Sequence, residues 1–139
     1  AQLLYAYGEA TVPKITVTLR KSYGGSHIVM GCKQLRSDLN FAWPSSEIAV
    51  MGASGAVAIL CGKEAKAKKE AGEDVKAFLA EKEDEYTEKF ANPYEAASYG
   101  YIDDVIEPRN TRFRICRGLA QLATKRQQLP AKKHGCMPM

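Results

Sequence analysis

The sequence predicts an α/β protein. Short segments rich in apolar and β-branched residues, at 13–20, 39–43 and 48–51, alternate with segments of helical composition. The 139 residues are 45% hydrophobic and 26% charged, which suffices for one modest domain with a core. The predicted strands are too few and too short to complete an open doubly wound sheet. We therefore expect the chain to be part of a larger fold.

In the first half of the chain, strands are expected to lead through glycine turns into helices. An N-terminal helix ends near Gly8. The segment 13–20 is expected to form one strand, because it is rich in β-branched residues. After it come a Gly24-Gly25 turn and a short helix from Ile28 to about Leu35. The following elements repeat this scheme: a strand over 39–43 before Pro44, a strand over 48–51, a turn over 52–55 and a helix over 56–60.

The second half is expected to be mainly helical. The segment 63–90 is rich in alanine and charge, which favours helix with a break at Gly72 and a solvated charged face. Asn92 and Pro93 have the residue types of an N-cap and a first helical position. A strand is expected over 101–106. The last helix is expected to be capped by Thr111 and to end before Pro130. Its apolar stripe consists of Ile115, Cys116, Leu119, Leu122 and Ala123.

Neither the cysteines nor the histidines have the spacing of a metal site. His27 and His134 lack a carboxylate or cysteine at ligand spacing, so we predict no metal. No apolar run approaches the ~20 residues needed to span a bilayer. The four cysteines, Cys32, Cys61, Cys116 and Cys136, include no C-x-x-C pair, so we expect no disulfide. Three of the four lie in apolar segments and are expected to be small core residues.

The net charge of +4 hides an asymmetry along the chain. Eight basic and no acidic residues follow Glu107, so the tail carries +8 and residues 1–107 carry −4. Such a tail is either a solvated helix face with a docked end or a surface for an acidic partner, nucleic acid or cofactor phosphates. Sites for single-stranded nucleic acid place several aromatic residues among the basic ones. Because Phe113 is the one aromatic residue among them here, we expect no nucleic-acid partner. The basic residues are Arg109, Arg112, Arg114, Arg117, Lys125, Arg126, Lys132 and Lys133.

The Gly24-Gly25 turn is the first candidate site. Backbone N–H groups at the start of a helix have no partner inside the helix, and here no bulky side chain covers them. Such N–H groups can stabilise an oxygen that gains negative charge during a reaction. A Gly-Gly pair after a strand can also be a turn without any catalytic role. A nucleophile–base pair of Ser26 and His27 is a weaker alternative, since adjacent residues on a helix point apart.

Longer strings carry a family resemblance. Residues 20–27, 40–57, 89–94 and 100–106, with parts of the terminal segment 111–138, closely resemble the carboxyltransferase (beta) subunit of biotin-dependent acyl-CoA carboxylases. That family includes propionyl-CoA and acetyl-CoA carboxylases and methylmalonyl-CoA carboxyltransferase. The string Ala-Trp-Pro followed by Glu-Ile-Ala-Val-Met-Gly is the most specific part, and the resemblance spans essentially the whole chain.

The resemblance implies a crotonase-like fold, in which each half of the subunit is a spiral of ββα units. Residues 1–139 would form the last part of the second, C-terminal carboxyltransferase domain, with no further domain. The implied partners are the remainder of the same subunit, further copies in a homo-hexamer, a biotin carboxylase and a biotin carrier. We expect the fragment to be inactive alone. The expected compartment is the cytoplasm, with the mitochondrial matrix as the alternative.

The resemblance also implies the reaction and its site. A carboxyl group moves from N-carboxybiotin to the α-carbon of a short-chain acyl-CoA, with no metal. The family's biotin site carries over to the backbone amides of Gly25 and Ser26, which would stabilise the ureido oxyanion. Position 26 is commonly Ala in the family, and the amide role survives that departure. Gly24 and Ile28 would contact substrate, Ile28 resembling the versions that accept acetyl-CoA or several short acyl-CoAs.

Gly52 and Gly55 are expected to allow close packing of a second turn beneath this site, rather than to contact ligand. Two alternatives to a carboxylase remain open at this point. A biotin-dependent acyl-CoA decarboxylase or transcarboxylase subunit would use the same site. A non-catalytic interaction module with a basic face belongs to a different class of protein, and binding to polyanions that weakens steeply with salt would favour it.

Overall fold

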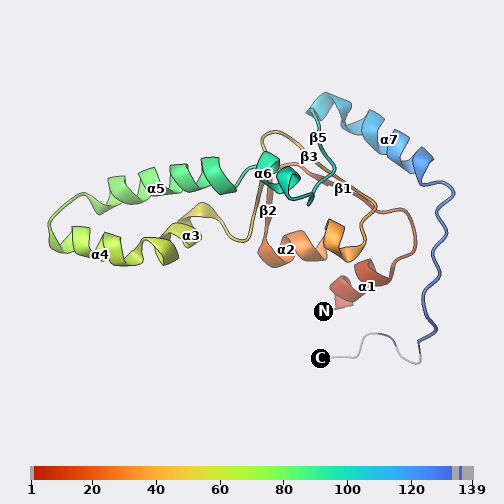
Figure 1. Cartoon of the computed structure of the whole chain (residues 1–139), viewed down its shortest axis with the longest axis horizontal. Helices are drawn as coiled ribbons and strands as arrows, with labels where there is room; N and C mark the ends of the chain where they lie inside the picture. Colours follow the sequence, from red (N-terminus) through yellow and green to blue (C-terminus); the bar gives the residue numbers. More distant parts are fainter. Residues whose placement is uncertain (1, 133–134, 136–139) are drawn as a thin grey trace.

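The computed structural model describes residues 2–132 and 135. It consists of a body of two small parallel sheets with surrounding helices, and an arm formed by α3, α4 and α5 that extends away from the body (Figure 1). The chain is thus of mixed α/β type, as predicted. His134, Cys136 and Lys133 lie outside the described residues.

Two successive ββα units build the body. The first contains β1 (Ile15–Thr18), β2 (Lys21–Tyr23) and α2 (Gly24–Val29), and the second contains β3 (Leu39–Ala42), β4 (Glu47–Ala49) and α3 (Ala53–Leu60). Equivalent strands pair in parallel, β1 with β3 and β2 with β4. The strand predicted over 13–20 is confirmed in shorter form as β1, but the prediction missed β2, which follows at 21–23 after a turn and belongs to the other sheet.

The remaining elements complete the body and the arm. Among them β5 is much shorter than the strand predicted over 101–106, because only two of its residues pair with β3. Their bounds are α1 (Gln2–Glu9), the 3₁₀ turn η1 (Lys33–Leu35), α4 (Gly62–Glu70), α5 (Val75–Phe90), α6 (Pro93–Ser98), β5 (Asp104–Val105), the 3₁₀ turn η2 (Pro108–Asn110) and α7 (Thr111–Gln121).

The core cluster lies where α6 packs on β3 and β4. Ala42, Ile48, Ala96 and Ile102 are all buried there. Helix α6 begins as the sequence predicts, because the Asn92 side-chain oxygen accepts a hydrogen bond from the Glu95 amide at 2.8 Å. Local chemistry alone therefore fixes this helix start.

Helix α7 departs from the prediction at both ends. Asn110, not Thr111, is its N-cap residue, and the Thr111 hydroxyl instead accepts a hydrogen bond from the Trp43 indole at 2.9 Å. The helix ends at Gln121, well before Pro130. Gly118 faces β1 and β3, where a Cβ would lie 2.7 Å from Leu39. The helix packs through this glycine, so the predicted stripe is only partly used: Cys116, Leu119 and Ala123 are exposed.

The cysteine prediction is confirmed only in part. Among the described residues, Cys32, Cys61 and Cys116 are free thiols. Cys32 is fully buried, as expected for a small core residue, whereas Cys61 is half-buried and Cys116 is exposed. Cys61 ends the apolar helix α3, and Cys116 lies on the solvent side of α7, so neither is a core residue in this structure.

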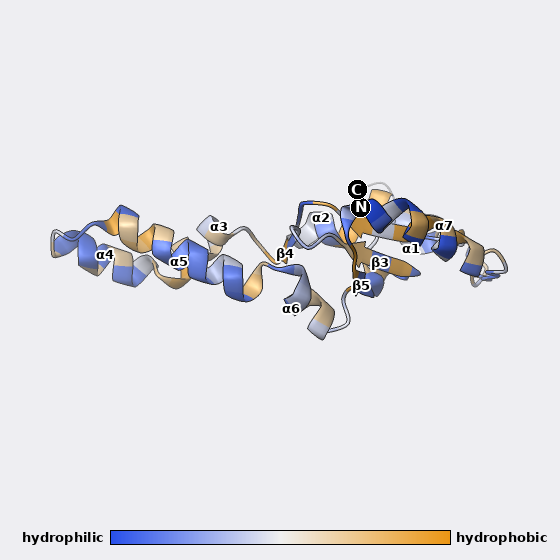
Figure 2. Cartoon of the chain, turned by 90° about the horizontal axis from the view of Figure 1, so that it is seen from above, coloured by the Kyte–Doolittle hydropathy of each residue, from blue (hydrophilic) through white to orange (hydrophobic). Residues whose placement is uncertain are grey.

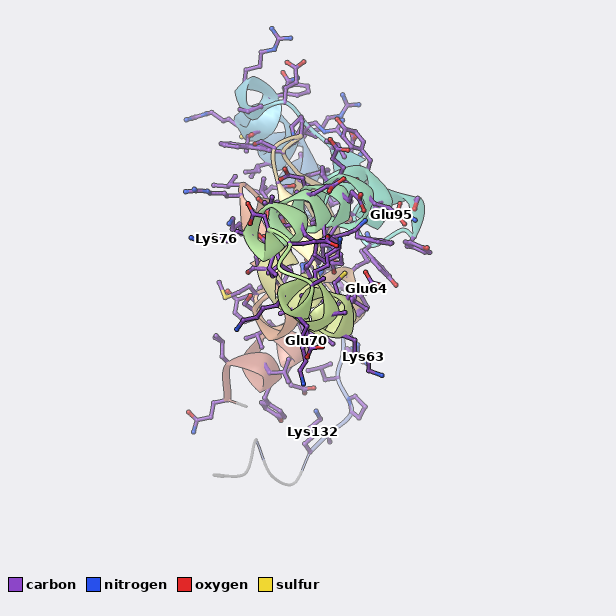
Figure 3. The ribbon with its side chains drawn as sticks, turned by 90° about the vertical axis from the view of Figure 1, so that its left-hand side faces the viewer. Lys63, Glu64, Glu70, Lys76, Glu95 and Lys132 are labelled. Carbon is purple, nitrogen blue, oxygen red and sulfur yellow. The ribbon has the colours of Figure 1, made fainter. Side chains whose placement is uncertain are left out.

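The arm is helical and charged, as its composition predicts. Gly72 has φ +76° and follows the end of α4, so the predicted break is real. Looking along the arm, Lys63, Glu70 and Lys76 project outward from α4 and α5 (Figure 3). Polar residues dominate α4 and α5 while α3 is largely apolar (Figure 2). Within the described residues, no helix combines the length and apolarity needed to cross a bilayer.

The basic tail is docked on the acidic part of the chain. Four of its eight basic side chains form ion pairs there: Arg109 with Glu107, Arg114 with Asp104, Lys125 with Asp38, and Lys132 with Glu9. The Lys125–Asp38 pair is the least exposed, with an N···O distance of 2.8 Å and side-chain exposures of 13% and 18%. This arrangement favours the docked-tail interpretation over a free basic surface.

Asp38 is expected to contribute stability that depends on pH. Burial alone would raise its pKa, but hydrogen bonds from the Lys125 ammonium and the Lys14 amide, with the charges of both lysines, lower the pKa below 3.8. The carboxylate therefore stabilises the fold fully above the unfolded-state pKa, and this contribution is lost as pH falls through the lower folded-state value. Asp38→Asn should lower the free energy of unfolding at pH 7 by about 1–3 kcal/mol.

Urea unfolding at pH 7 and below pH 3 measures this effect, which should shrink at the lower pH. Glu85→Gln is the matched control. It breaks the more exposed Lys82–Glu85 pair within one turn of α5, and should change stability by at most about 0.5 kcal/mol. Equal losses from the two variants would contradict the special role of Asp38.

Candidate active site

The two strand-to-helix junctions of the ββα units meet at one edge. Because β2 and β4 are parallel, with Tyr23 opposite Ala49, both strands end on the same side. Helix α2 follows β2 directly, and α3 follows β4 after a short turn. The helix starts at Gly24, not at Ile28, so the two glycines form the first turn of the helix and not a separate turn before it. This is a correction to the sequence-based expectation.

Gly24 makes the closest contact between the two junctions. Its φ is +50°, in the left-handed region, and a Cβ at this position would lie 2.7 Å from the Val50 carbonyl oxygen. A side chain is therefore excluded both by the backbone conformation and by the neighbouring turn. Gly25, by contrast, has open space where a Cβ would be.

Gly52 supports the site from the second turn, whereas Gly55 is less constrained. A Cβ at Gly52 would lie 3.4 Å from the Tyr23 ring, a tight contact with the residue that precedes Gly24. At Gly55 the nearest atom is the Met51 sulfur at 3.9 Å, which is an ordinary contact. The packing is therefore tighter at Gly52 than at Gly55, which lies inside α3 and not in a turn as predicted over 52–55.

The amides of Gly25 and Ser26 face no internal acceptor. Tyr23 is the N-cap residue of α2 and supplies no capping side chain. Neither amide donates a hydrogen bond to backbone or side chain within residues 2–132, and both residues are exposed. The Ser26 hydroxyl donates to the Tyr23 carbonyl at 2.6 Å. The first turn of α2 therefore presents free N–H donors.

The structure does not bring Ser26 and His27 together. The His27 Nδ1 atom lies 2.9 Å from the hydroxyl of Ser22, which is on β2. Burial lowers the pKa of His27 below 6.5, so the ring is neutral at pH 7. Sequence reasoning missed this Ser22–His27 pair, although a serine and a histidine five residues apart across a strand end were a visible signal.

A second side-chain contact ties the two strands together. The Tyr23 hydroxyl donates to the Glu47 carboxylate on β4. Burial, together with the hydrogen bond and charge of Glu47, raises the pKa of Tyr23 to about 12. The phenol therefore stays protonated at physiological pH and remains a donor. Nothing in the sequence pairs these residues, which are 24 positions apart.

The remaining predicted site residue, Ile28, is 46% exposed and lies on α2 beyond His27. No group of three or more His, Cys, Asp or Glu side chains with metal-binding geometry occurs among the described residues. The groups at this edge include the backbone donors of α2, the neutral His27 ring, the Tyr23 phenol and the Ile28 side chain.

Comparisons with known proteins place this chain in a family. Residues 1–137 match the model of the carboxyl transferase domain. The chain is 53% identical over 139 residues to the propionyl-CoA carboxylase beta chain of Saccharopolyspora erythraea, and 52% identical over 139 residues to the methylmalonyl-CoA decarboxylase subunit alpha of Propionigenium modestum. Each of the two alignments includes 100% of this chain and 26% of the relative.

A solved structure gives the same result. The chain superimposes on transcarboxylase 12S, a hexamer with methylmalonyl-CoA and methylmalonic acid bound, with a TM-score of 0.87 and 54% identity. The match covers 99% of this chain and 26% of that one. The chain belongs to the carboxyl transferase domain family. The predicted fold class, α/β of the crotonase-like type, is confirmed by this match and by the two ββα units.

Substitution of the two adjacent glycines should separate their roles. Gly24→Ala places a Cβ in a left-handed conformation against the Val50 carbonyl, and should lower the free energy of unfolding by at least about 2 kcal/mol. Gly25→Ala meets open space and replaces glycine in a helix, so it should be neutral or stabilising by up to about 1 kcal/mol. Thermal and urea unfolding measure both. Similar stabilities for the two variants would show that the junction does not need Gly24.

Proposed function

We propose that this chain is part of a biotin-dependent acyl-CoA carboxyltransferase, which transfers a carboxyl group from N-carboxybiotin to the α-carbon of a short-chain acyl-CoA. The observation that supports it is the similarity at over 50% identity, along the whole chain, to a propionyl-CoA carboxylase, a methylmalonyl-CoA decarboxylase and a transcarboxylase. These relatives share one chemical operation, the gain or loss of a carboxyl group beside a CoA thioester.

The chain's own contribution is a pair of backbone donors. When bound, biotin supplies the carboxyl group, and its ureido oxygen gains negative charge as that group leaves. The Gly25 and Ser26 amides would donate hydrogen bonds to this oxygen, since they are exposed and lack an internal acceptor. Donors fixed in advance in this way are worth roughly 2.7–4 kcal/mol each in other enzymes. The absence of a side chain at Gly25 leaves the approach to these donors open.

The site is incomplete without other polypeptide. The chain spans about a quarter of the length of the relatives that it matches. The active protein would contain the remainder of the same subunit, form a homo-hexamer, and work with a biotin carboxylase and a biotin carrier. Residues 1–139 alone would be inactive. The compartment would be the cytoplasm in a bacterium and the mitochondrial matrix in a eukaryote.

A decarboxylase or transcarboxylase component is the second candidate, since relatives of both kinds match equally well. All three use the same carboxyl transfer and differ in its direction and in the partner that receives the group. ATP-dependent fixation of bicarbonate by the native complex would favour the carboxylase. Failure to fix bicarbonate, with a sodium-pumping membrane partner in the complex, would favour the decarboxylase.

The role of the Ser26 amide is tested by a matched pair of variants in the full-length subunit. Ser26→Pro removes the N–H at a first-turn position, where the amide has no intrahelical hydrogen bond to lose. It should lower kcat for carboxyl transfer about 10²- to 10³-fold. Ser26→Ala keeps the amide and should keep most of the activity. Steady-state kinetics with free biotin as acceptor measures both, and equal activities would contradict the proposal.

The acyl-chain preference is proposed to depend on Ile28, which is exposed next to the amides. Ile28→Asp in the full-length subunit should shift selectivity from acetyl-CoA toward propionyl-CoA, because an acidic residue at this position resembles propionyl-preferring members of the family. Rates with the two thioesters, expressed as a ratio of kcat/KM values, measure the shift. An unchanged ratio would dismiss the role of Ile28.

A further inference from the structure

We propose that Ser22 and His27 form a positioning pair that holds the Gly25 and Ser26 amides in place. The inference rests on the proposed function, because it concerns the donors assigned there to the biotin ureido oxygen. Neither side chain is proposed to touch the reacting atoms. Their hydrogen bond, at 2.9 Å, joins the end of β2 to the middle of α2 and so closes a bracket around residues 23–26.

The first turn of α2 needs such a bracket. The helix has only six residues, and its N-cap residue contributes no side-chain hydrogen bond. Two of its first three residues are glycines, which lose more conformational freedom on ordering than other residues do. An isolated turn of this length is unstable in water, so its geometry must come from tertiary contacts.

The other contacts of this turn do not replace the bracket. The Ser26 hydroxyl bonds to the Tyr23 carbonyl, which lies inside the same turn and moves with it. The Tyr23–Glu47 contact ties β2 to β4, but it acts before the helix begins. Gly24 abuts the Val50 carbonyl, which limits approach from one side only. Within the described residues, the Ser22–His27 bond is the side-chain hydrogen bond that joins the residues on either side of 23–26.

The His27 ring is suited to a fixed, uncharged support. It is half-buried, and burial keeps it neutral at pH 7. No carboxylate pairs with it among the described residues, in contrast to the orienting acid of a nucleophile–base system. A serine hydroxyl can donate or accept, so the bond forms with either tautomer. These properties fit a positioning residue and not a general base.

The test uses the full-length subunit, with free biotin as acceptor and a carboxylated acyl-CoA as donor. The carboxyl group leaves the α-carbon and joins a biotin ring nitrogen, and the nitrogen's proton ends on the α-carbon. An Asn side chain can place a polar atom near the position of Nδ1, whereas a Gln side chain reaches toward Nε2. His27→Asn should therefore retain the bond to Ser22, and His27→Gln should lose it.

We expect His27→Gln and Ser22→Ala each to lower kcat/KM for biotin about tenfold, less than the hundredfold that a 1 Å displacement can bring. The KM for the acyl-CoA should stay unchanged, His27→Asn should stay within about twofold of the parent, and the double variant should lose no more than either single one. Ser98→Ala is the control. It removes a serine hydroxyl that bonds to the Glu95 carbonyl on α6, and should leave both kinetic constants unchanged.

Three results would overturn the pair: full activity of His27→Gln, equal losses in His27→Asn and His27→Gln, or additive losses in the double variant. Hydrogen exchange of the Met30 amide, which donates to the Ser26 carbonyl at 3.1 Å, reports on α2 independently of activity. Faster exchange in His27→Gln than in His27→Asn supports the bracket, and equal exchange overturns it. If the parent subunit transfers no carboxyl group, the proposed function fails, and the exchange experiment still decides the pair.

Discussion

The contact between Gly24 and the Val50 carbonyl determines the geometry of the candidate site. Two parallel strands end side by side, and each continues into a helix, so the two junctions compete for the same space. A glycine at φ +50° lets the first helix begin directly at the strand end, with the second turn packed 2.7 Å from where a Cβ would be. The Tyr23 ring also packs against Gly52, so the two junctions contact each other at a second point. The amides of the first turn are free because Tyr23, the N-cap residue, makes no side-chain hydrogen bond to them.

Ion pairs dock the C-terminal basic tail on the rest of the chain. The acidic part and the basic tail of the chain meet through four ion pairs, and Lys125 on Asp38 is the most sheltered of these. Removing either partner of an ion pair of low exposure leaves an uncompensated charge, which lowers the stability of the fold. This pair and the packing of Gly118 on Leu39 and Ile15 hold the tail on the body. Half of the basic residues that would serve a polyanion are thus already engaged, which weakens the interpretation of a basic interaction module.

The proposed chemistry uses backbone atoms, so it does not depend on the side chain at position 26. The side chain at this position faces the Tyr23 carbonyl and leaves the amide free. Side chains matter here by fixing the backbone: Ser22 and His27 across the turn, and Tyr23 and Glu47 across the strands. The arm of α3, α4 and α5 projects away from this edge (Figure 1).

The sequence by itself determined the α/β class, the family, the start of α6 at Asn92-Pro93 and the break at Gly72, since each rests on composition, specific strings or local backbone chemistry. Only the tertiary structure decided that β1 ends at Thr18 and that 21–23 forms a further strand, because pairing partners distant in sequence determine where a strand ends. The same holds for α7, whose start depends on Trp43 and whose buried face is set by a glycine against two strands. The partners of His27 and Tyr23 also required the fold, since hydrogen bonds between elements depend on register and not on local pattern.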